Sequence, residues 1–219
     1  MKKILKVVII LIIIALVAFS IHVIRNMIIL NSLDEKVKEL ENNNNNIYGE
    51  IISNSSTVEK QTVKMYFKDN VLKQEVETQT KDGKKVKMIQ ITYPNERKVF
   101  MYNNDNEKTA QTYEGENNIN NTTIIMNYTE CIAFSEKIVN SIVTNIKTEE
   151  LDGKECYVIR GLHNGNIMYE AGTEKVIVYI EKETGLPLKR VDIAKDKEFV
   201  TTYEYKFGVV TDEDIKEPI

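Results

Sequence analysis

The chain has 219 residues, of which 33 are acidic and 29 basic, so its formal net charge is −4 at pH 7. The first 30 residues carry four basic side chains and no acid, so the rest of the chain is strongly acidic. An acidic body argues against nucleic acid as a partner, because phosphate binding needs a basic surface. Two histidines and two cysteines leave little room for metal or nucleophile chemistry.

A long apolar run opens the chain. Residues 7–24 read VVIILIIIALVAFSIHVI, in which only Ser20 and His22 are polar. At about 1.5 Å per residue, a helix of this length comes close to the ~30 Å hydrocarbon core of a bilayer. Three lysines within the first six residues place the N-terminus in the cytoplasm and the rest of the chain outside. We therefore expect residues 1–30 to be a signal-anchor that spans the cell membrane once.

A cleaved signal peptide is the alternative for this leader. Ala18-Phe19-Ser20 offers small residues at the spacing of a cleavage site. Cleavage there would leave a mature end that begins with the apolar residues after Ser20, and the run is longer than an ordinary signal-peptide core. Both points favour an anchor that stays attached.

The segment 31–46 reads as a connection between the membrane and the rest of the chain. Ser32 is suited to cap a short helix with one apolar face. Five asparagines follow at 42–46, and asparagine is a poor helix former. We interpret the asparagine run as a helix stop and a flexible spacer that holds an extracytoplasmic domain, residues 47–219, away from the membrane.

Strand patterns dominate residues 47–219. Asp82-Gly83, Asp152-Gly153 and Asn164-Gly165 favour tight hairpins. One segment, 123–143, instead places apolar residues three and four apart, as in an amphipathic helix. The prediction is a mainly β fold with some α: a curved antiparallel sheet of about ten or eleven strands, wrapped on a helical insertion. The expected strands are 62–68, 71–80, 86–93, 98–102, 109–113, 145–150, 155–161, 167–181, 187–193 and 199–207.

One strand indicates how the sheet is covered. Residues 175–181, KVIVYIE, are apolar on both faces. An antiparallel sheet usually has one face in water, so both faces of this strand must be covered. A curled sheet with a helix as its plug would meet that need and would enclose an apolar cavity.

The C-terminal third resembles a known family. The segments VIVYIEKETGLPLKRVDI and EFVTTYEYKFGVV, followed by TDEDIKEP, place Thr184-Gly185-Leu186-Pro187 between two strands and end in an acidic tail. This pattern resembles the LolA-like family of lipoprotein carriers, LppX-type lipoproteins and RseB-type regulators, including anchored Gram-positive sporulation and germination proteins. The resemblance covers residues 145–219 in detail. It implies a half-barrel with an apolar cavity for acyl chains.

The resemblance and the strand alternation together suggest a function. The leading hypothesis is an anchored binding protein that holds a lipid, an acyl chain or a lipoprotein tail. The alternative is a regulatory or scaffolding module that docks a cell-envelope protein, such as a cell-wall enzyme, without lipid. Aromatic and methionine side chains on the strands are the candidates for lining the cavity, with ordinary core as the alternative: Met65, Phe67, Met88, Phe100, Tyr102, Val178, Ile180, Tyr203 and Tyr205.

Other reactive side chains offer little chemistry. Cys131 and Cys156 suit either a disulfide or two buried thiols. His163, beside a predicted hairpin, has no serine–acid partners that would suggest a triad, and Asp212 and Asp214 read as a solvated tail rather than a cation site. We therefore expect no enzyme, no cofactor and no metal site.

Overall fold

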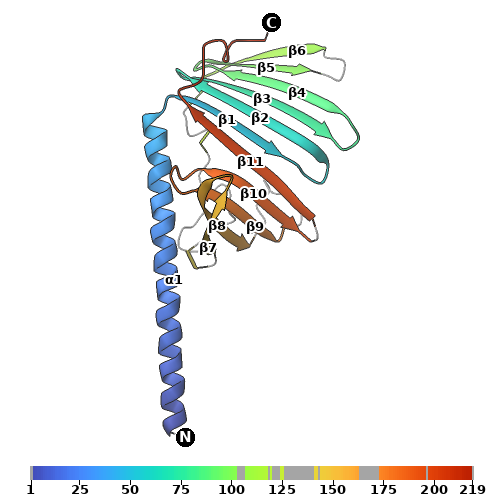
Figure 1. The fold of residues 1–219 in the computed structure, drawn as a ribbon. Coiled ribbons are helices and arrows are strands. Elements are labelled where there is room, and N and C mark those ends of the chain that lie inside the picture. Colours follow the sequence, from blue (N-terminus) through green and yellow to red (C-terminus); the bar gives the residue numbers. More distant parts are fainter. Residues whose placement is uncertain are drawn as a thin grey trace.

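We analysed a computed structural model of the chain (Figure 1), which describes residues 2–102, 107–117, 119, 124–125, 141–142, 144–162, 173–195 and 197–218. A single long helix, α1 (Lys2–Asn43), precedes eleven strands. The strands are β1 (Asn46–Ser53), β2 (Val58–Lys68), β3 (Val71–Thr80), β4 (Lys85–Thr92), β5 (Glu96–Tyr102), β6 (Lys108–Glu114), β7 (Asn145–Leu151), β8 (Lys154–Leu162), β9 (Lys175–Glu181), β10 (Pro187–Ala194) and β11 (Lys197–Phe207).

The strands form one curved antiparallel sheet that does not close. Its order is β6-β5-β4-β3-β2-β1-β11-β10-β9-β8-β7, so β6 and β7 are its edges. Every pair is a sequence neighbour except β1 with β11, and that pair joins the two halves of the meander. The half-barrel with an N-terminal apolar helix predicted from the sequence is confirmed, with eleven strands.

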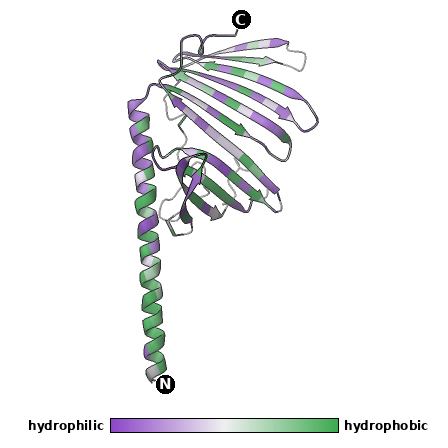
Figure 2. Ribbon diagram, in the orientation of Figure 1, coloured by the Kyte–Doolittle hydropathy of each residue, from purple (hydrophilic) through white to green (hydrophobic). Residues whose placement is uncertain are grey.

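Helix α1 has two parts with different surroundings. The segment from Ile4 onward contains an 18-residue window of mean hydropathy 3.2, none of it buried, and is long and apolar enough to cross a membrane. The second part is amphipathic, and Leu30 and Leu33 are completely buried against the sheet. Figure 2 shows the change in hydropathy along the helix, and Figure 1 shows the sheet beside only its second part.

This continuity differs from the sequence interpretation of 31–46 as a short helix and spacer. The helix runs without interruption through those residues to Asn43, and Asn46 already belongs to β1. The asparagines do end the helix, as predicted. However, Leu33 and Val37 pack into the core of the sheet, and this packing joins the apolar segment of α1 directly to the sheet.

The face of the sheet on which α1 packs is called here the inner face, and the other the outer face. Ile29, Leu30 and Leu33 pack there against side chains of β7–β9 and β11: Ile146, Ile159, Val176, Val178, Ile180 and Tyr203. Val37 joins a second cluster that contains Ile47, Met65, Phe67, Leu72, Ile124, Ile125 and Leu186. A helix of this chain therefore fills one half of the inner face.

The predicted and observed elements differ in one strand. Strand β1 was not predicted, and it occupies the centre of the sheet. The predicted helix 123–143 lies mostly outside the described residues, although Ser141 and Ile142 are helical, and so does the first part of the predicted strand 167–181.

Candidate functional site

A row of apolar residues crosses the inner face from the core to the open half of the sheet. Successive strands place its members directly opposite one another: Tyr203, Ile51, Val63, Val76, Met88 and Met101. We call this set the apolar row. Tyr203 is 7% exposed beside α1, whereas Met101 at the other end is 49% exposed. The row therefore leads from a filled core to a surface that α1 leaves uncovered.

The open half of the inner face carries further exposed apolar side chains. Val86 on β4 and Tyr113 on β6 are 46% and 45% exposed, and the register places both on the same face as Met101. Arg97 stacks on the Tyr113 ring, with the guanidinium carbon 4.9 Å from the ring centroid. By the register, Val86 lies beside the Met88–Met101 pair and extends the exposed end of the apolar row, whereas Tyr113 lies two register rows away.

The predicted cavity residues divide into three groups. Met65, Phe67, Val178, Ile180, Tyr203 and Tyr205 lie on the inner face in the two clusters that α1 covers. Met88 lies in the apolar row. Their role in ligand binding stays a prediction.

Phe100 and Tyr102 lie on the outer face, where they contribute to a separate cluster with Ile89 and Ile91. The alternation of β5 explains the difference, since Val99 and Met101 point to the inner face and their neighbours point away from it. The sequence did not distinguish the two faces of β5, because both carry apolar residues, and a role of Phe100 and Tyr102 in ligand binding stays a prediction. Sequence reasoning also missed Met101, whose place on the inner face follows from its pairing with Met88.

The inner face also holds an ion pair. Arg190 and Asp192 on β10 are each 6% exposed and lie 2.5 Å apart, Nη2 to Oδ1. They are paired in register with Val178 and Val176 of β9, so the charges lie next to the apolar core beside α1. Buried charges are tolerated only when paired, because desolvation of either one alone is costly.

Polar contacts fix α1 to the sheet where its apolar segment ends. Asn26 is completely buried and donates its side-chain amide hydrogens to the main-chain carbonyls of Ser141 and Thr144, each over 3.0 Å. Arg25 donates to the carbonyl of Ile146 over 3.2 Å. These bonds place the start of β7 beside the end of the apolar segment.

The turn between β9 and β10, which carries the family-like Thr184-Gly185-Leu186-Pro187 sequence, receives the second part of α1. Gly185 has φ +78°, and a Cβ built on it would lie 2.9 Å from the carbonyl oxygen of Leu33. Lys36 donates to the carbonyl of Lys182, and Leu186 is buried in the same cluster as Val37. The turn is therefore a contact point for the helix.

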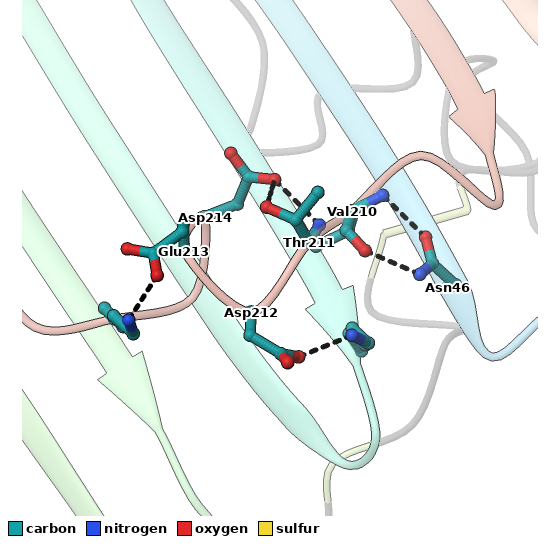
Figure 3. A network of polar contacts seen from close by, with 8 residues as sticks. Asn46, Val210, Thr211, Asp212, Glu213 and Asp214 are labelled. Carbon is teal, nitrogen blue, oxygen red and sulfur yellow. Dashed lines mark hydrogen bonds and ion pairs between the residues drawn. The ribbon is translucent and has the colours of Figure 1, made fainter.

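The acidic tail is bound to the outer side of the sheet rather than free in solvent. Asp212 is paired with Lys68 at 2.5 Å, and Asp214 accepts hydrogen bonds from the main-chain and side-chain donors of Thr211. Figure 3 shows these contacts of the tail. Asn46 exchanges two hydrogen bonds of 2.8 Å with the main chain of Val210. Among the described residues, no group of three or more His, Cys, Asp and Glu is placed to hold a metal ion.

Of the predicted disulfide and the histidine at position 163, the structure describes only Cys156. Cys156 is buried on β8, where burial and the nearby Glu181 carboxylate raise the pKa of its thiol. Cys131 and His163 lie outside the described residues, so the Cys131–Cys156 bond stays a prediction.

No protein-family description matches the chain, and no curated protein matches it. Solved structures that align with it share the LolA-like fold. LprF from Mycobacterium bovis has a TM-score of 0.45 and 9% identity, with 83% of this chain and 93% of LprF aligned. MucB has a TM-score of 0.43 and 8% identity, with 86% of this chain and 62% of MucB aligned.

A LolA superfamily protein from Nitrosomonas europaea also aligns, with a TM-score of 0.26 and 13% identity over 86% of this chain and 97% of that protein. Because every one of these TM-scores is below 0.5, the alignments carry no conclusion about ligand or partner. The function must therefore be argued from this chain's own surface.

Proposed function

We propose that this chain is a membrane-anchored extracytoplasmic binding protein that holds a lipid or acyl chain on the inner face of its half-barrel. The observation that carries the proposal is the apolar row, which continues from the core beside α1 to the exposed side chain of Met101. An acyl chain is long, narrow and apolar, so it matches a row of this shape.

The side chains along the row suit such a ligand. Met88 and Met101 are directly opposite each other on β4 and β5. Methionine is unbranched and flexible, so it adapts to apolar ligands of different shape. Burial of each CH₂ contributes about 0.8 kcal/mol, and about a dozen carbons would therefore provide most of a useful affinity.

The anchor places this surface close to lipids. The contacts of Arg25 and Asn26 hold β7 beside the end of the apolar segment of α1, so the sheet would begin at the membrane surface. With the N-terminus in the cytoplasm, the sheet would lie outside the cell. The proposal includes no catalytic step.

A second candidate function is docking of a cell-envelope protein. The edge strand β6 supports it, since all seven of its residues are exposed. An exposed edge strand offers unpaired main-chain groups to an extended segment of a partner. Lipid would not be needed for such docking.

Site-specific photocrosslinking of the full chain in its native membrane distinguishes the two candidates. We would replace Met101 by p-benzoylphenylalanine, irradiate, purify and measure the intact mass. The control position is Ala110, which is exposed on the outer face of β6. A lipid-sized adduct at Met101 but not at Ala110 supports lipid binding. A protein-sized adduct supports docking, and equal or absent labelling at both positions contradicts the proposed inner-face site.

A further inference from the structure

The asparagine run that sequence reasoning read as a spacer lines a groove. A cavity of about 400 Å³ lies where α1 passes into β1, and five of its eight lining residues are asparagines: Asn42, Asn43, Asn44, Asn45 and Asn70. Asn42, Asn43 and Asn45 are exposed, so in the part of the chain that the structure describes these carboxamides are not needed for packing.

A second cavity of about 300 Å³ continues the first along the sheet. The two share Ile119, and the second is also lined by Gln74, Gln90 and Asn117. Their floors are continuous, because Phe67 of the first cavity is directly opposite Leu72 of the second. Together they form one groove over the ends of β2–β5, which we call the carboxamide groove.

The floor of the groove is apolar and fixed. Phe67 and Leu72 are 4% and 5% exposed and belong to the cluster around Val37. Of the described residues that line the two cavities, one is basic, Arg97, and two are acidic, Glu41 and Glu116, so the polar walls are nearly neutral. The groove therefore combines apolar contact below with neutral hydrogen-bonding groups above.

Several of these carboxamides are oriented by hydrogen bonds of their own. Asn117 donates to the carbonyl of Tyr93 over 2.9 Å, and Gln90 donates to the hydroxyl of Thr92 over 3.3 Å. Asn44 donates to the carbonyl of Leu40 over 2.8 Å. Donation through the amide nitrogen fixes the orientation of the side chain, and each carboxamide carries both a donor and an acceptor.

We propose that the carboxamide groove binds an extended, nearly uncharged peptide segment of another protein. A carboxamide has the same donor and acceptor as a peptide group, so it can pair with the main chain of a peptide whatever its sequence. The apolar floor at Phe67 and Leu72 would lie beneath that segment. This site goes beyond the proposed lipid site, which lies along the apolar row.

Other ligand classes fit the groove less well. A sugar ring usually needs an exposed aromatic face, and Phe67, the one aromatic residue among those lining the two cavities, is 4% exposed. An acyl chain would strip water from the carboxamides without replacing their hydrogen bonds. The groove also lies at the end of α1 that is farthest from the apolar segment (Figure 1), so it would face away from the membrane.

The test uses the full chain in nanodiscs. A phage-displayed library of random nonapeptides, first depleted on empty nanodiscs, would be selected on the protein, and an enriched peptide would be labelled for fluorescence anisotropy. We expect the double variant Gln74→Ala/Gln90→Ala to weaken binding at least tenfold. Gln111→Ala is the matched control, because Gln111 lies in the same register row on β6 but outside both cavities.

Asn45→Ala serves as a second variant, since this exposed side chain can be removed with little risk to folding. We expect it to weaken binding several-fold, while Gln111→Ala stays within twofold of the unmodified chain. Failure to enrich any peptide, or an enriched peptide whose affinity is the same for all variants, would overturn the proposal. Binding of a chitin tetrasaccharide that is lost in the double variant would also overturn it and would assign the groove to glycan.

Because the readout residues differ, this test is independent of the proposed lipid site. Crosslinking at Met101 reports on the apolar row, whereas the peptide affinities report on Gln74, Gln90 and Asn45. Either result can fail while the other holds.

Discussion

The side-chain amide of Asn26 donates a hydrogen bond of 3.0 Å to the main-chain carbonyl of Thr144, 118 residues further along the chain. This bond joins the end of the apolar segment of α1 to the residue that precedes β7. Because Asn26 is completely buried, the bond is shielded from water. The apolar segment of α1 and the sheet are therefore joined by direct contacts as well as by the chain itself.

Replacement of Asn26 by alanine should destabilise this junction. The change removes the donor to the carbonyls of Ser141 and Thr144, and loss of a partner from a buried polar group costs about 1–3 kcal/mol. Urea unfolding of the full chain in detergent micelles, followed by circular dichroism, would measure the free energy. Glu39→Ala, at an exposed position of the same helix, should change it little. An unchanged stability of Asn26→Ala would show that the junction is not formed.

Leucines in the two parts of α1 should respond differently to truncation. Leu33 is completely buried in the core, so Leu33→Ala should cost about 2–5 kcal/mol of unfolding free energy. Leu11 is 60% exposed within the apolar segment, so Leu11→Ala should leave the stability of the sheet unchanged. The same unfolding measurement decides the point. Equal effects would contradict the division of α1 into membrane and core parts.

The domain boundary expected from the sequence can be tested by truncation. A chain that begins at residue 47 lacks Leu30, Leu33 and Val37, and would expose the apolar side chains that they cover. We expect it to bind the dye ANS and to lack cooperative unfolding. A chain that begins at residue 22 keeps these contacts and should unfold cooperatively. Cooperative unfolding of both chains would show that α1 is dispensable for the core.

Replacement of Gly185 by alanine should destabilise the chain more than the same replacement of Gly83, which has a similar backbone conformation. Both Gly185 and Gly83 have positive φ, +78° and +85°, which costs alanine about 1–2 kcal/mol. At Gly185 the added Cβ would also lie 2.9 Å from the Leu33 carbonyl oxygen, whereas nothing lies within 4 Å at Gly83. Gly185→Ala should therefore lower the melting temperature more than Gly83→Ala. Equal shifts would mean that α1 moves away from the turn without cost.

Attachment of the acidic tail should depend on pH. The hydrogen bond and charge of Lys68 hold the pKa of Asp212 below its usual range, and hydrogen bonds from Thr211 do the same for Asp214. A lowered pKa stabilises the attached state above the ordinary Asp pKa of about 3.9, and this contribution is lost as pH falls through the lower, bound-state value.

The contribution of the Lys68–Asp212 pair also has an upper pH limit, because Asp212 raises the pKa of Lys68. Its contribution is present below the ordinary Lys pKa of about 10.4 and is lost as pH rises through the raised value. NMR titration of the Thr211 amide should show one transition in acid, and Asp212→Asn should weaken the tail attachment at neutral pH, because it removes the ion pair with Lys68. A flat titration curve would contradict this role of the carboxylates.

Local patterns in the sequence were sufficient for most of the elements, although not for β1. The uninterrupted apolar run identified the segment from Ile4 onward as long enough to span a membrane, because a helix in lipid needs apolar side chains on every face. Alternation located most strands, since side chains of a strand point to opposite faces in turn. The asparagine run correctly marked the end of α1 at Asn43, because asparagine disfavours helix.

Tertiary packing decided which faces these elements use. Phe100 and Met101 are both apolar neighbours on β5, so only the pairing with β4 shows that Met101 faces the inner side. The sequence of α1 does not reveal that Leu30 and Leu33 enter the core of the sheet, because their partners, such as Ile146 and Val178, lie more than a hundred residues away. The place of the asparagines in a groove also depends on contacts with β2–β5. Periodicity fixes local conformation, whereas the burial of a given face depends on residues distant in the chain.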